Sequence, residues 1–140
     1  MMVFEHDYKN YPELTNKEIQ EIGITSPHKQ ITEDFKARVV DVHDGDTIKV
    51  EVDFRDFNFP VRFLGTAAPE LDEVGGKEAQ SWLEELILGE EVDIVVDNYN
   101  RVGKWGRLLG VIKLMGIDIN QKSMDEGFAV SFESLENLWK

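Results

Sequence analysis

The sequence predicts an α+β fold in which five short strands form a barrel and helices pack against it. Apolar and polar residues alternate in short segments, a helical repeat separates the third segment from the fourth, and a second helical segment follows the fifth. This is the order of the five-stranded Greek-key barrel, the OB-fold type, although other small α+β folds share it. The expected strands are residues 35–42, 47–54, 57–64, 92–96 and 108–114.

Length and composition fit one globular domain. The chain has 140 residues, and no apolar run approaches the ~20 residues of a membrane span. The absence of cysteine excludes a disulfide framework and a thiolate zinc site. The first residues lack the basic and apolar regions of a signal peptide, so we expect a cytoplasmic location or leave the compartment open, with no membrane partner and a monomeric state.

We expect two parts, an N-terminal arm (residues 1–34) and a folded domain (residues 35–140). In the arm, Thr15 and Glu18 form a capping-box pattern and Gly23 follows, which predicts one short helix. Such a helix is marginal alone, so it should dock on the domain.

The segment from Val40 to Glu70 organises the domain. Asp44-Gly45 lies between two alternating segments, which predicts a hairpin with a tight primed turn and positive φ at its central residues. Asp46 has the parity of Ile48, so its carboxylate should point toward the core side. A second tight reversal is expected near residues 55–56, and Pro60 predicts an edge position or a bulge in the third strand.

Two helices have clear limits in the sequence. Apolar residues recur at helical spacing from Ala79 to Ile87, with Gly75-Gly76 before them and Gly89 after them. Asp118 can cap a second helix through about residue 126, which Gly127 ends. Residues 134–139 predict a last helical turn.

Charge is unevenly distributed along this acidic chain, whose formal net charge is −13. Residues 69–97 hold ten acids against Lys77, a balance of −9, which can also be an ordinary solvated helix face. Residues 101–122 carry five basic residues against Asp118, a balance of +4. The basic residues are Arg101, Lys104, Arg107, Lys113 and Lys122.

Three separated motifs resemble the staphylococcal nuclease (thermonuclease) family. They are Asp44-Gly45-Asp46-Thr47, the segment from Arg62 to Pro69-Glu70, and Lys104-Trp105-Gly106-Arg107. The resemblance covers about residues 35–132 and implies the OB-fold-like barrel of that family. It also implies a nuclease that cleaves DNA or RNA, single-stranded or denatured, with a divalent cation.

The resemblance implies a role for each matched residue. Arg62, Glu70 and Arg107 would be catalytic, with the arginines on the phosphate and Glu70 as the general base, a role still argued over in the family. Asp46, Glu70 and the backbone carbonyl of Ala68 would bind calcium, with Asp44 behind them. Lys104, Trp105 and Arg107 would bind the substrate.

One departure weakens this implied site. The family usually has aspartate two residues before the proline, where this chain has Ala67. Calcium affinity depends on the number of carboxylates, so the site is expected to be weak, open to other divalent cations, or inactive. The alternative is a non-catalytic barrel that binds nucleic acid or protein.

Each of these residues also has a plainer interpretation. A lone arginine on a half-exposed strand is usually a surface residue, and aspartates are frequent in turns without any metal. Trp105 can stack on a base or simply pack. His43 is interpreted as structural.

Overall fold

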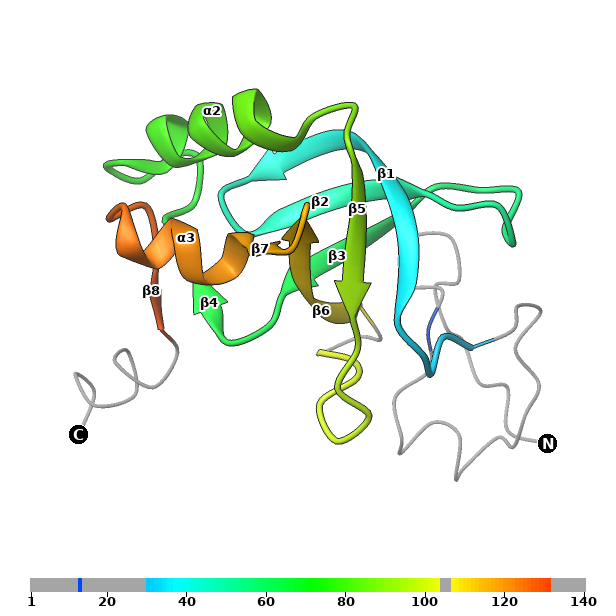
Figure 1. Ribbon diagram of the computed structural model, residues 1–140. Coiled ribbons are helices and arrows are strands. Elements are labelled where there is room, and N and C mark those ends of the chain that lie inside the picture. The colour runs from blue at the N-terminus through cyan, green and yellow to red at the C-terminus, as the bar shows by residue number, and fades with distance from the viewer. Residues whose placement is uncertain (1–12, 14–29, 104–106, 132–140) are drawn as a thin grey trace, which may run out of the picture.

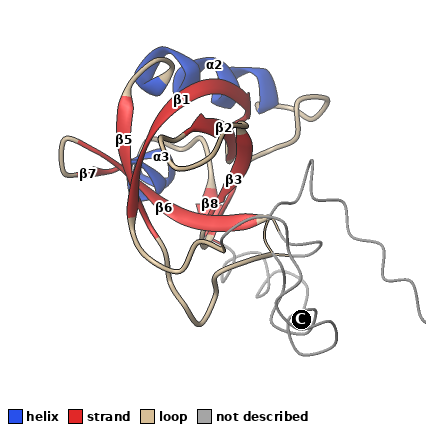
Figure 2. Cartoon of the chain, turned by 90° about the vertical axis from the view of Figure 1, so that its right-hand side faces the viewer, coloured by secondary structure: helices blue, strands red, loops and turns tan. Residues whose placement is uncertain are grey.

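The computed structural model describes residues 13, 30–103 and 107–131. Five strands form a barrel, in the order β3-β2-β1-β5-β6, and parallel pairing between β3 and β6 closes it (Figures 1 and 2). The predicted barrel fold is therefore confirmed. The five strands are β1 (Phe35–Asp44), β2 (Thr47–Glu51), β3 (Phe59–Phe63), β5 (Glu91–Val95) and β6 (Leu108–Leu114).

Two helices and three very short strands complete the described part of the chain. Helix α2 (Gly76–Ile87) lies over β1, and α3 (Ile119–Asp125) follows the hairpin of β6 with β7 (Ile117–Asp118), as Figure 1 shows. Strands β4 (Thr66–Ala67) and β8 (Val130–Ser131) pair with each other. Two-residue strands carry no readable alternation, so the sequence did not predict β4, β7 and β8. Neither described helix is long and apolar enough to cross a membrane.

Alternation places the apolar side chains inside the barrel. The burial of β3 alternates strictly, with Phe59, Val61 and Phe63 fully buried and Pro60 and Arg62 partly exposed. Helix α2 adds Leu83 and Ile87 to the same core, and β5 and β6 add further branched residues. The fully buried large residues include Ile48, Phe59, Phe63, Leu83, Ile87, Ile94, Leu108 and Ile112.

The predicted helix limits are confirmed. Gly75 has φ 86° and precedes α2, and Gly89 has φ 81° and follows it. The Asp118 side chain accepts a hydrogen bond from the Gln121 N–H and caps α3, and Gly127 ends the helix with φ 82°. The helices predicted near Thr15 and at 134–139 lie outside the described residues.

The hairpin at Asp44 is confirmed, but the predicted primed turn is wrong. The turn residues are Gly45 and Asp46, and neither has a positive φ. A register shift between Val42 and Asp44 supplies the strand twist that a primed turn would otherwise give. Gly45 is instead needed for space, because a Cβ there would lie 2.7 Å from Ala68 Cβ and 2.8 Å from Ala79 Cβ.

The second predicted reversal is also wrong as a tight turn. Strand β2 ends at Glu51 and β3 begins at Phe59, so the connection is an open loop. The loop is wide because Arg55 turns inward, where its guanidinium lies 4.6 Å from the centre of the Phe59 ring. Pro60 pairs with Lys49 of β2 but precedes the first residue paired with β6, so its missing N–H leaves that ladder intact.

Candidate functional site

Asp46 joins three segments at one end of the barrel. The residue is 5% exposed, which agrees with the predicted position of its carboxylate toward the core side. Oδ2 accepts hydrogen bonds from Ala68 N at 2.9 Å and from Arg62 Nη2 at 3.3 Å, and Oδ1 accepts one from Thr47 Oγ1 at 3.1 Å. The β1–β2 turn, β3 and the segment after β4 therefore meet at a single carboxylate.

Glycines let these segments approach one another. Gly45 brings the turn against Ala68 and α2, as its missing side chain requires. At Gly76, a Cβ would lie 1.8 Å from the Glu70 carbonyl oxygen, so only glycine lets α2 begin against the loop that carries Glu70. Gly45 and Gly76 therefore determine how closely the backbone segments around the predicted site approach, and they contribute no charge to it.

Two arginines lie on the same outer face of the barrel. In the parallel β3–β6 pair, Arg62 is opposite Leu109, and Arg107 precedes Leu109 by two residues and so shares its face. Strand spacing and rise put the Arg62 and Arg107 Cα atoms about 8 Å apart. The Arg62 side chain is 23% exposed, and its guanidinium donates to Asp46.

Asp44 lies behind Asp46. Its Oδ1 accepts a hydrogen bond from Asp46 N at 3.1 Å, a local turn contact typical of aspartate. Burial raises the pKa of the Asp44 carboxyl to about 6, and the hydrogen bond and negative charge of the Asp46 side chain add to the rise. Asp44 therefore ionises less readily than an ordinary aspartate.

Glu70 is exposed in the loop before α2. Its N–H donates to Glu73 Oε1 at 2.9 Å, and its carbonyl accepts from Glu73 N at 2.9 Å. These contacts shape the loop that follows Pro69 but do not tie the Glu70 carboxylate to Asp46. Its predicted role as base and ligand stays a prediction.

The described donor set falls short of a calcium cage. Calcium takes six to eight oxygen ligands, several of them carboxylates. Among the described residues, no group of three or more His, Cys, Asp or Glu side chains is placed to hold a metal ion. Asp46 already accepts three hydrogen bonds, and Ala67 offers no side-chain oxygen. The residues present therefore do not fit a tight calcium site.

An open hollow of about 340 Å³ lies where the missing carboxylate would be. Ala67 pairs across the small sheet with Val130, a residue that is 47% exposed. Trp82 stacks on Phe128 at 4.9 Å between ring centres and supports this side of the hollow. The lining consists of Ala67, Ala68, Pro69, Glu73, Gly127, Phe128, Ala129 and Val130.

The predicted basic patch is smaller than its composition suggests. Arg101 is buried and donates to Glu13 Oε2 at 2.7 Å, so it cannot face a substrate. Lys122 forms an ion pair with Glu126, four residues on in the chain. Lys104 and Trp105 lie outside the described residues, and their substrate-binding role stays a prediction.

The comparisons with known proteins agree with this geometry. The model of the staphylococcal nuclease homologue family matches residues 60–138, more than half of the chain. The chain belongs to the staphylococcal nuclease homologue family. An uncharacterised protein of Bacillus anthracis is 29% identical over 102 residues, which is 70% of this chain and 48% of that protein. The chain thus spans about half the length of this relative.

Sequence reasoning missed two buried polar residues of this staphylococcal nuclease homologue. Asn120, on α3, accepts from Ile112 N and donates to the carbonyls of Leu64 and Gly110, so it ties α3 to β6 and to the end of β3. An asparagine beside Ile119 on a short capped helix was the only signal. Glu13 is fully buried against two arginines, and nothing in its sequence surroundings indicated this.

Proposed function

We propose that this staphylococcal nuclease homologue binds the backbone of single-stranded DNA or RNA and hydrolyses its phosphodiester bonds with a weakly held divalent cation. The observation that supports this best is the Asp46–Arg62 pair, which orients a part-exposed arginine side chain on the same barrel face as Arg107. Guanidinium groups present a planar fork to two phosphate oxygens, so a pair of them suits a phosphodiester.

The two arginines have distinct parts in this proposal. Arg62 is oriented by Asp46 and binds the phosphate before reaction. Arg107 stabilises the extra negative charge that develops on phosphorus during attack by water. Glu70, exposed beside the turn of Pro69, is the proposed base that takes the proton of that water. Lys104 and Trp105 would hold the flanking nucleotides.

The cation is the part of the proposal that experiment must decide. Asp46, Glu70 and the Ala68 carbonyl are the proposed ligands, and calcium is the first cation to test because oxygen donors suit it. With fewer carboxylates than the family provides, the site should bind weakly and accept other divalent ions.

A second function is favoured by two specific observations. The apolar pair Ala67–Val130 stands where the family pattern has a carboxylate, and the chain is strongly acidic. Both features suit a domain of nuclease fold that binds nucleic acid or a protein without cutting.

One assay separates the two functions. Labelled single-stranded DNA and RNA are incubated with the full chain in calcium, in manganese and in chelator, and both binding and cleavage are measured. Arg62→Lys keeps the charge beside Asp46 but removes the fork. Arg38→Ala, the matched control, removes a surface arginine that forms an ion pair with Glu51.

Cation-dependent cleavage that Arg62→Lys abolishes and Arg38→Ala preserves supports the nuclease. Binding without cleavage in any cation, weakened by Arg62→Lys, supports the second function. Cleavage or binding that is equal in the parent and Arg62→Lys would refute the placement of the site.

A further inference from the structure

A buried ion cluster joins Glu13 to the loop between β2 and β3 and to the loop between β5 and β6. Glu13 has no exposed surface, and its carboxylate accepts hydrogen bonds from Ile31 N at 2.9 Å, from Arg101 Nη1 at 2.7 Å and from Arg55. The side chains of Arg55 and Arg101 are almost as buried, at 3% and 4% exposed. One carboxylate thus meets two guanidinium groups away from water.

Such a cluster holds its members in one arrangement. Removing one member of a buried ion pair is costly because the remaining charge stays desolvated and uncompensated. Here loss of the Glu13 charge would leave two buried cations side by side, with Arg55 stacked over the Phe59 ring. Arg101 would then lose its ion pair with Glu13.

Arg101 connects the cluster to β6, the strand that directly follows Arg107. Its side chain donates to the Ile31 carbonyl at 3.0 Å, and its own backbone carbonyl accepts from Leu109 N at 3.0 Å. Gly103 N donates to the Arg107 carbonyl at 2.8 Å. Arg101 and Gly103, in the middle of the loop between β5 and β6, are therefore paired with Leu109 and Arg107 where the loop enters β6.

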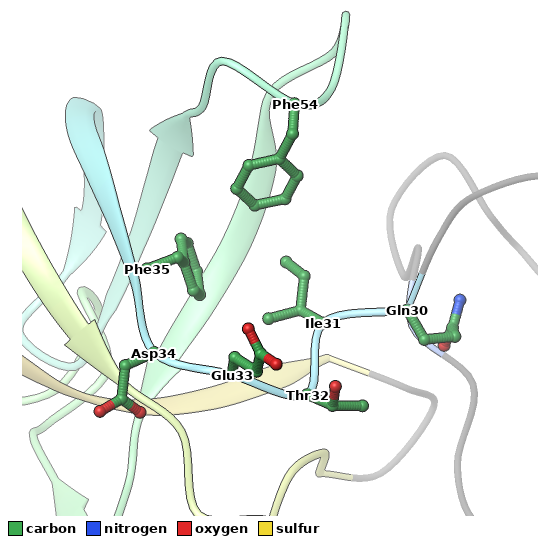
Figure 3. Close-up of a pocket in the computed structure, with 7 residues that line it drawn as sticks. All are labelled: Gln30, Ile31, Thr32, Glu33, Asp34, Phe35 and Phe54. Atoms are coloured by element: carbon green, nitrogen blue, oxygen red, sulfur yellow. The ribbon is translucent and has the colours of Figure 1, made fainter.

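The same contacts fix the segment that leads into β1. The Ile31 N–H donates a hydrogen bond to Glu13, and the Ile31 carbonyl accepts one from Arg101. Its side chain lines an open hollow of about 310 Å³ together with Phe35 and Phe54, as Figure 3 shows. Asp34 continues this attachment by accepting from Val96 N at 2.8 Å, just after β5.

We propose that Glu13 is a positioning residue for Arg107. Its carboxylate fixes Arg101, the Arg101 backbone fixes the start of β6, and that start carries the arginine proposed to contact the phosphate. Glu13 lies outside residues 60–138, which the family model matches, so this support comes from a part of the chain beyond the matched region. The effect on substrate rests on the proposed function, whereas the effect on the loop does not.

The test compares Glu13→Gln with Glu33→Gln in the full chain. The control removes the same charge from an exposed residue of the neighbouring segment. Amide hydrogen exchange at Leu109 and Gly103 reports on the loop, and binding of single-stranded DNA reports on the site. We expect exchange at both amides to rise about tenfold or more in Glu13→Gln and to stay unchanged in Glu33→Gln.

A double-mutant cycle shows whether Glu13 acts through Arg107. If it does, Glu13→Gln weakens DNA binding in the parent but adds little to Arg107→Ala. Full additivity of the two losses would overturn the positioning role, as would unchanged exchange at Leu109. If Arg107→Ala alone leaves binding intact, the proposed function fails, while the exchange data still decide the loop contact.

Should Glu13→Gln fail to fold, Arg101→Lys provides the second variant. It keeps a buried positive charge near Glu13 but replaces Arg101 Nη1, which donates to both Glu13 and Ile31, by an ammonium group on a shorter side chain. Faster exchange at Leu109 in folded Arg101→Lys supports the inference, and exchange at the parent rate overturns it.

Discussion

Replacing Ala67 by aspartate tests whether the candidate site lacks only a charge. Ala68 N lies 2.9 Å from Asp46 Oδ2, and a Cβ lies about 3 Å from the next backbone nitrogen, so the position 67 Cβ is within about 6 Å of that oxygen. The hollow beside Ala67 leaves room for the longer side chain. A carboxylate at position 67 can therefore share a cation with Asp46.

The magnitude follows from Coulomb's law. Two unit charges about 6 Å apart interact by ~0.7 kcal/mol in water and by ~3 kcal/mol at an effective dielectric constant of 20. Without a cation, Ala67→Asp should therefore lower the free energy of unfolding by roughly this range through repulsion of Asp46. A divalent ion at a similar distance from the new carboxylate is attracted by about twice this energy. That energy corresponds to at least about a tenfold increase in calcium affinity.

The assay pairs calorimetric calcium titration with thermal unfolding and cleavage of single-stranded DNA, each with and without chelator. Ala67→Asn is the matched control, since it has the same size without the charge. Ala67→Asp should bind calcium more tightly, gain thermal stability when calcium is added and cut faster than both the parent and Ala67→Asn. If the Asp and Asn variants have equal calcium affinity and equal cleavage rates, the carboxylate site has been misplaced and the non-catalytic function is favoured.

Three further predictions concern the same region. Arg107→Ala should reduce turnover by about 10²-fold or more with an unchanged thermal melt, and full activity in the folded variant would contradict its role. Binding of single-stranded DNA should be weak and should weaken as salt rises, and Arg107→Ala should reduce the slope of log K against log salt by about 0.7; binding that salt does not affect would contradict this. Because burial raises the pKa of Asp44 from 3.8 to about 6, the folded state binds its proton more tightly than the unfolded state. The free energy of unfolding should then fall by about 2 kcal/mol as pH rises from 4 to 6, and denaturant melts of Asp44→Asn should lack this fall.

Local patterns were enough to predict most of the barrel and its helices. Alternation located the strands, and the glycines around α2 and the cap at Asp118 depend on neighbours within a few residues. The inward direction of Asp46 followed from parity with Ile48. Such features are predictable because the interactions that cause them are close in sequence.

The errors have long-range causes. Gly45 was assigned a positive φ because Asp-Gly favours primed turns, but contacts with Ala68 and Ala79 decide its conformation. Arg101 was counted as a surface cation, yet its partner Glu13 is 88 residues away in the chain. No local pattern reveals partners that are so far apart in the chain. The motifs therefore predicted which residues belong to the candidate site, but not the contacts that hold them. The division into an arm and a domain at residue 34 stays a prediction.

In the proposed function, paired charges explain how such an acidic chain would present an arginine to a phosphate. Asp46 and Glu13 each fix the direction of a guanidinium group, but only Arg62 keeps an appreciable part of its side chain exposed. A broad basic surface is therefore not what would attract nucleic acid, and the surrounding acids would repel it at long range. Recognition must then depend on a few oriented contacts that act only when the phosphate is already close. Such a site gains more from correct geometry than from added positive charge, because a fork aligned with two phosphate oxygens discriminates where a diffuse field does not.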